Sequence, residues 1–197
     1  MLCSTILNVL KKYKRAEAGI AAIEFAFILP FMLLLYFGLM DLTGMIGFSR
    51  KITAVANTMA DLTAQNRTSV LKSDITDYYN AASLIMNPTP IGNVTINMYG
   101  YRMVGTTPTQ QWKTTNGTGP GCNNAPQVSA MTPLMGAGND LVVSVACYRF
   151  TPYVATFMGD KILGNTTIKV EQLIMVRPRS TAKLDCYTST AQTTLCS

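Results

Sequence analysis

The residues most suggestive of chemistry lie near the start of the chain. Glu24 stands at the mouth of a long apolar run, directly before Phe25, and the small-residue stretch Gly19–Ile23 precedes it. A carboxylate in the first turn of a membrane-spanning segment is energetically costly, so it indicates a specific role, such as pairing with a positive charge. A basic stretch, Lys11 to Arg15, lies just upstream. The order is therefore a basic leader, a small-residue junction and an apolar helix that carries one acid.

The remaining polar residues do not predict catalysis. The chain has no histidine, which removes the commonest general base and the usual catalytic triad. It has neither a P-loop nor a G-x-G-x-x-G motif, so nucleotide cofactors are not expected. The formal net charge of +6 comes in part from the leader, and no basic cluster interleaved with aromatic residues follows it. We therefore expect no enzymatic activity, no cofactor and no nucleic-acid partner.

The positions of the five cysteines indicate whether the chain lies in an oxidising or a reducing compartment. Cys3 lies in the leader, whereas Cys122, Cys147, Cys186 and Cys196 all follow the apolar run. An even number of cysteines in an exported region predicts two disulfides. Three connectivities are possible, and we favour Cys122–Cys147 with Cys186–Cys196 because each joins neighbours across a loop. Zinc is the competing interpretation, but the chain lacks histidine and any C-x2-C pair.

The apolar run is long enough to cross a membrane. It extends from Phe25 to Phe48 with one interruption, Asp41, and these 24 residues would form a helix about 36 Å long. A cleaved secretory signal peptide and an uncut signal anchor are the alternatives. In each case the basic end stays in the cytoplasm and the remainder is exported. The hydrophobic fraction of 48% and the charged fraction of 13% agree with a membrane segment.

Two helices are expected around and after the span. Pro30 lacks a backbone donor and predicts a kink near Ala26. The first helix should continue through residues 49–65, since apolar residues recur there at helical spacing. A second amphipathic helix is predicted over residues 69–86, with Ser69 as its N-cap and Asn87-Pro88 as its stop. Its apolar stripe comprises Leu71, Ile75, Tyr78, Ala82 and Ile85.

The rest of the chain has the pattern of β-structure. Strands are predicted over residues 94–104, 110–115, 140–150 and 166–176. The last alternates, with Ile168, Val170, Ile174 and Val176 on one face and Lys169, Glu171 and Arg177 on the other, which is typical of an antiparallel strand with one face in water. The predicted fold class is α+β: a long N-terminal transmembrane helix, a second amphipathic helix and a small antiparallel sheet stapled by disulfides.

The N-terminal stretch resembles a known family. The residues Ala18-Gly19-Ile20-Ala21-Ala22-Ile23-Glu24-Phe25-Ala26-Phe27-Ile28-Leu29-Pro30 and the following Leu-rich run into Phe37-Gly38 are similar to the TadE-like pseudopilins of tight-adherence (Flp) pilus systems. Near the other end, Tyr148-Arg149-Phe150-Thr151-Pro152 and Val176-Arg177-Pro178-Arg179 fit more loosely. Such a protein is pilin-like and serves adhesion or secretion through pilus assembly.

The resemblance implies a processing step and an assembly contact. A prepilin peptidase would cut between Gly19 and Ile20, and Glu24 and Phe25 complete the processing site. Cleavage leaves a charged amine on Ile20, which Glu24 of a neighbouring subunit would pair with. Glu24 and Pro30 are thus the expected assembly residues. The domains implied are a leader (1–19), a transmembrane helix (20–48), a helical extension with a second helix (49–87) and an exported β domain (88–197).

The same resemblance implies partners and a location. The partners would be the prepilin peptidase, other pilins and pseudopilins, the inner-membrane assembly platform and membrane lipid. The protein would cross a bacterial inner membrane once, with its N-terminus in the cytoplasm and its C-terminal domain in the periplasm, and it would enter an extracellular pilus if it joins the fibre. A pseudopilin of a type II secretion or type IV pilus system, or an uncut signal-anchored periplasmic module, remain open alternatives.

Overall fold

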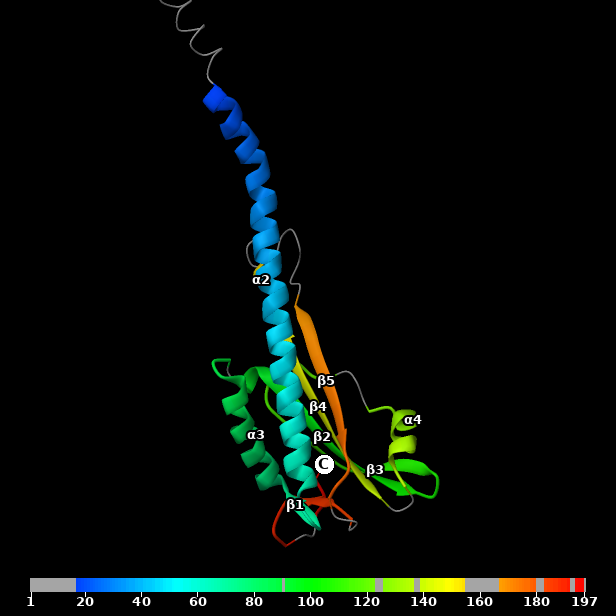
Figure 1. Cartoon of the computed structure of the whole chain (residues 1–197). Helices are drawn as coiled ribbons and strands as arrows, with labels where there is room; N and C mark the ends of the chain where they lie inside the picture. Colours follow the sequence, from blue (N-terminus) through cyan, green and yellow to red (C-terminus); the bar gives the residue numbers. More distant parts are fainter. Residues whose placement is uncertain are drawn as a thin grey trace, which may run out of the picture.

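A single long helix projects from a small α+β domain (Figure 1). The computed structural model describes residues 17–89, 91–122, 126–136, 139–154, 167–179, 183–191 and 194–196. The helix, α2, spans Glu17–Ala64 and continues through Pro30 without a break. The basic leader stretch and Cys3 lie outside the described residues. The continuation past residue 48, predicted from helical spacing, is confirmed.

Four antiparallel strands form the main sheet in the order β3-β2-β4-β5. The strands are β2 (Val94–Val104), β3 (Thr107–Asn116), β4 (Asp140–Phe150) and β5 (Ile168–Val176). These are the four strands that the sequence predicts, and the bounds of β2 and β4 agree to the residue. Gly105, in the turn between β2 and β3, has a φ of 64°, a conformation that suits glycine.

The C-terminal half of α2 packs against one face of this sheet, beside helix α3 (Lys72–Met86). Alternate residues of β2 and β4 face this core, which is why Val94, Ile96 and Met98 share it with Ile52 and Met59 of α2. The apolar face of the sheet and the apolar face of α2 therefore pack together in one hydrophobic layer. This shared layer holds the projecting helix rigidly to the sheet.

The opposite face of the sheet is covered, contrary to the expectation of a face in water. Tyr99, Tyr101 and Met103 of β2 form a second core there, together with Met131 and Met135. The two methionines belong to a cover made of α4 (Val128–Met131), the 3-10 helix η2 (Thr132–Leu134) and the residues beside them. Leu173 and Met175 of β5 pack against this second core. The expectation of a face in water rested on the charged residues of β5 and did not take these two apolar residues into account.

The start of the second helix was predicted wrongly. Residues 69–71 form a short strand, β1 (Ser69–Leu71), which pairs in parallel with β6 (Asp185–Tyr187). Helix α3 therefore begins at Lys72, and the carboxylate of Asp74 accepts a hydrogen bond from the Leu71 N–H at 3.1 Å, so Ser69 is not the cap. Two members of the predicted stripe, Ile75 and Ala82, are buried as expected. Tyr79 and Met86 are the other buried residues of α3, whereas the predicted Tyr78 and Ile85 are only partly buried. A 3-10 turn, η1 (Ile91–Asn93), leads from α3 into β2.

Several bonds tie the C-terminal segment to the sheet. Asp140 accepts two hydrogen bonds from the Arg102 guanidinium, both 2.7 Å long, and a third from the Leu184 N–H at 2.6 Å. Arg102 also contacts Asp185 at 2.9 Å, and these bonds raise the pKa of Arg102 above its ordinary value. The Trp112 indole N–H donates to the Leu184 carbonyl at 2.9 Å.

Two disulfides join Cys122 to Cys147 and Cys186 to Cys196. These are the pairings that the argument from neighbouring loops favours. The first fastens the cover of the second core to β4, and the second closes the C-terminal loop that follows β6. Disulfides over loops of this size commonly contribute about 2–4 kcal/mol.

Candidate functional site: the projecting helix and its junction with the domain

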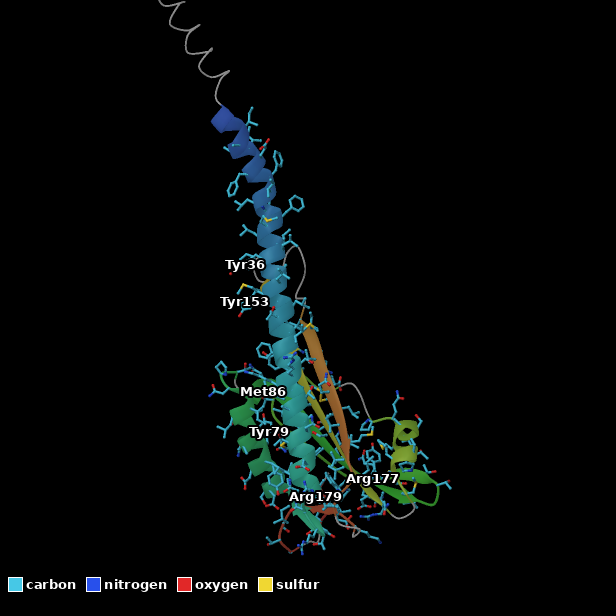
Figure 2. The ribbon with its side chains drawn as sticks, viewed as in Figure 1. Tyr36, Tyr79, Met86, Tyr153, Arg177 and Arg179 are labelled. Atoms are coloured by element: carbon cyan, nitrogen blue, oxygen red, sulfur yellow. A yellow bond between two sulfur atoms is a disulfide. The ribbon has the colours of Figure 1, made fainter. Side chains whose placement is uncertain are left out.

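The projecting part of α2 is apolar and bare. Its large apolar side chains between Ile20 and Met40 are exposed except for the half-buried Phe37, and none of the most apolar stretch is fully buried against the domain. An exposed apolar surface of this size indicates a membrane or a protein partner. The helix is long and apolar enough to cross a membrane. Figure 2 shows these side chains radiating on all sides of the helix.

The four predicted processing residues lie in the first three turns of α2. Ile20 and Phe25 are 61% and 63% exposed, so both are open to a partner. A Cβ added to Gly19 would meet no atom within 4 Å, so packing within the chain does not require glycine there. Glycine in a helix is less favourable than alanine by roughly 0.5–1 kcal/mol. Within the described part of the chain, packing therefore gives no reason for a glycine at this position.

Glu24 is also exposed, about one turn after Ile20 on the same helix. Its side chain has no hydrogen bond or ion pair within the part of the chain that the structure describes. A lone carboxylate on an apolar helix would be unstable in hydrocarbon without a counter-charge. Among the described residues, Glu24 therefore has no counter-charge.

Pro30 is the second predicted assembly residue, and it lies one and a half turns after Glu24. The helix is continuous at this point, as stated above, and Gly38 two turns further on has open space around its Cα. Glu24 and Pro30 therefore lie on one continuous helical segment. Both side chains are exposed in the part of the chain that the structure describes.

Asp41 is a functional residue that the sequence reasoning missed. Its carboxylate accepts hydrogen bonds from the backbone N–H groups of Tyr153 and Val154, at 2.5 and 2.8 Å. These two residues follow β4, so one acid of the apolar run clamps the end of a strand more than 100 residues away. Figure 2 places Tyr153 beside α2, close to the level of Tyr36. The sequence does show that Asp41 is a charged residue inside an apolar run, but it does not show which groups its carboxylate binds.

Aromatic packing extends the junction beyond Asp41. The ring of Phe48 stacks on Tyr148 with 5.0 Å between ring centroids, and it also contacts Phe150 at 5.6 Å. A Cβ added to Gly44 would lie 3.5 Å from the Phe150 ring, which is ordinary contact, so the helix approaches the strand closely here. Burial raises the pKa of Tyr148 above its ordinary value. Among the described residues, Asp41, Gly44 and Phe48 thus mark the stretch of α2 at which the end of β4 contacts the helix.

Three potential metal ligands lie close together at the sheet's second core. Cys122, Cys147 and Glu171 bring their ligand atoms within 4.8 Å of one another. The two cysteines are joined as a disulfide, however, and a disulfide sulfur is not the thiolate that zinc requires. The donor set therefore does not fit a zinc site in the oxidised protein.

Comparison with known proteins gives one match. Residues 19–61 match the family model described as TadE-like protein. The match begins at the predicted junction glycine and ends in the docked half of α2. No curated protein and no solved structure matches the chain. The sheet and the C-terminal segment thus lie outside the matched range.

Proposed function

The chain is TadE-like over residues 19–61, and on that basis we propose that it is a minor pseudopilin that supports assembly of a tight-adherence pilus. The family supports an association with this pilus system. The observation that carries the finer proposal is the bare apolar helix with an unpaired acid near its start, joined rigidly to a folded domain. A helix of this kind serves both as a membrane anchor and as a packing element between subunits.

The first step of the proposed function is removal of the leader. A prepilin peptidase cuts between Gly19 and Ile20, and the exposure of Ile20 and Phe25 supports access to this site. The cut leaves an α-amine on Ile20, which is protonated below a pKa of about 7.7–8. The processed helix then starts with a positive charge, four residues before Glu24.

The second step is pairing between subunits. Glu24 of one subunit accepts the Ile20 amine of its neighbour, so neither charge is left alone in hydrocarbon. Because both groups sit on a rigid helix, the pair fixes the axial offset between two subunits. The small surfaces at Ala22, Ala26 and Gly38 allow helices to approach closely beside it.

The proposed topology puts the processed end at the cytoplasmic side of the inner membrane. From Ile20 to Asp41 the helix rises about 32 Å at 1.5 Å per residue, close to the thickness of a bilayer core of about 30 Å. The clamp at Asp41 therefore marks the outer boundary of the span, about two turns earlier than the boundary at Phe48 expected from the apolar run. The disulfide-bonded domain then lies in the oxidising periplasm.

A strain that lacks this protein and carries a plasmid-borne variant tests the proposal. We expect Glu24→Gln to be processed at the normal rate but to lower the amount of sheared surface pili roughly tenfold, since loss of one ion pair worth about 1.4 kcal/mol has that effect. Asp77→Asn is the matched control, because Asp77 is an exposed acid on α3 and should leave piliation unchanged. Normal piliation in the strain without the protein would refute the function itself. Normal piliation with Glu24→Gln would refute only the pairing.

A further inference from the structure

One end of the domain is fixed next to the membrane by the geometry of the junction. Tyr153 and Val154 are bound at Asp41, and the Phe150 ring lies at Gly44, about 4.5 Å further along the helix axis. The polar headgroup layer of a bilayer is roughly 5–7 Å thick on each side. The end of β4 therefore lies at the level of lipid headgroups. This step rests on the proposed membrane span but not on the proposed pilus role.

Basic side chains gather at this end. We call Arg50, Lys51, Arg149 and Lys169 the membrane-facing rim: the first two follow Phe48 on α2, and the last two are register partners at the ends of β4 and β5. Lys51 donates to the Asn87 carbonyl at 2.8 Å, and Lys169 lies 3.7 Å from Glu171.

Arg50 and Arg149 have no ion pair or hydrogen bond among the described residues. Their guanidinium groups are always charged and carry several donors in a fork that matches phosphate. The acids of the described domain other than Asp41 and Glu171 lie toward the far end, for example Asp140 and Asp185 beside the C-terminal segment. Within the part of the chain that the structure describes, Glu171 therefore pairs with Lys169, whereas Arg50 and Arg149 keep their charge without a partner.

A depression with a volume of about 350 Å³ opens beside Arg149. Its lining is mostly polar and comprises Asn93, Thr118, Gly119, Pro120, Arg149 and Thr151. Close packing shapes this site, because a Cβ on Gly119 would lie 2.4 Å from the Asn93 carbonyl oxygen, and the Thr118 hydroxyl donates to the Gly92 carbonyl at 3.0 Å. The site therefore combines a free guanidinium with side-chain amide and hydroxyl groups.

We propose that this depression binds the phosphate of an anionic phospholipid headgroup and that the membrane-facing rim seats the domain on an anionic lipid surface. Arg149 pairs with the phosphate. Arg50, whose Cα lies about 13.5 Å beyond Asp41 along the helix axis, adds only longer-range attraction from the helix side. An anionic lipid is favoured over a zwitterionic one because the rim has an excess of positive charge, and each basic residue near such a surface contributes to binding. The contact limits tilting of the domain on its helix.

Hydrogen exchange of the full chain in lipid nanodiscs tests this proposal. Nanodiscs of phosphatidylcholine alone are compared with nanodiscs in which the fraction of phosphatidylglycerol is raised stepwise, and exchange is followed in peptides that cover residues 116–121. We expect phosphatidylglycerol to slow exchange there. Arg149→Gln should raise, about fivefold, the fraction of phosphatidylglycerol that is needed for half of the slowing. Arg149→Lys should bring this fraction most of the way back to that of the unsubstituted chain. Arg177→Gln, which removes an exposed charge at the opposite end of β5, should have no effect.

The outcomes separate this proposal from its premise. A chain that does not co-purify with nanodiscs would overturn both the membrane span and the lipid site. A chain that inserts but exchanges equally in both lipids, or for which Arg149→Gln changes nothing, would overturn the lipid site alone. Slowing by inorganic phosphate in phosphatidylcholine nanodiscs, without an effect of phosphatidylglycerol, would assign the site to a soluble anion and overturn the lipid proposal.

Discussion

Gly100 in β2 lies against the only tryptophan of the chain, and this contact gives a quantitative prediction. A Cβ added to Gly100 would lie 2.1–2.8 Å from three atoms of the Trp112 indole. Trp112 is 1% exposed, so the indole has no free space to move into. We therefore expect Gly100→Ala to displace the indole and to destabilise the domain.

The magnitude follows from three contributions. Overpacking of a filled core costs about 1–3 kcal/mol, and weakening of the bond from the Trp112 N–H to the Leu184 carbonyl adds about 1 kcal/mol. The lower backbone entropy of alanine in the unfolded chain offsets about 0.5–1 kcal/mol. The expected loss in the free energy of unfolding is therefore about 2 kcal/mol, which lowers the Tm by roughly 4–8 °C for a domain of this size.

A double-mutant cycle with Trp112→Phe isolates the clash. The free energy of unfolding is measured in detergent micelles by urea titration, with far-UV circular dichroism as the signal, because Trp112→Phe removes the fluorophore. Phenylalanine lacks the five-membered ring that meets the added methyl group, so Gly100→Ala should cost less than about 0.5 kcal/mol in that background. Gly121→Ala, where a Cβ has open space, is the control. An equal cost of Gly100→Ala in both backgrounds would refute the reasoning.

Three further predictions concern single polar groups. Asp140→Ala should lower the free energy of unfolding by about 3 kcal/mol, because it leaves the part-buried Arg102 with one carboxylate, and urea titration measures this loss. Burial raises the pKa of Tyr79, so above pH 10 the unfolded chain releases a proton that the folded chain keeps; stability should fall as the pH rises past 10, and Tyr79→Phe should flatten this slope. Asp41→Ala should quicken hydrogen exchange of the two amides that its carboxylate holds by roughly tenfold, and unchanged exchange would contradict the clamp.

Local patterns in the sequence predicted much of the fold. The helical spacing after Phe48 predicted the docked half of α2, and the pattern of residues 94–104 predicted β2 with its bounds. Such elements can be predicted because apolar residues that recur with the period of a helix or strand form the face that becomes buried. The two disulfide pairings also followed from short separations, 25 and 10 residues.

The missed features depend on contacts distant in sequence. Strand β1 is three residues long and pairs with β6, which lies more than 100 residues later, so nothing local marks Ser69–Leu71 as a strand rather than a helix start. The cover over the second core contains a helix of only four residues, too short for a periodic signal. Asp41 was visible as an anomaly in the apolar run, but its partners are backbone groups, which no side-chain pattern announces.

We propose that this chain, which matches the TadE-like family model over residues 19–61, is processed after Gly19 and assembled through the new amine of Ile20. The most direct test is the N-terminal sequence and intact mass of the membrane-expressed protein, with and without its cognate prepilin peptidase. The account predicts a peptidase-dependent loss of residues 1–19, which leaves Ile20 first. A chain that begins at Met1 in both samples would contradict it, and the protein would then be an uncut, signal-anchored periplasmic module.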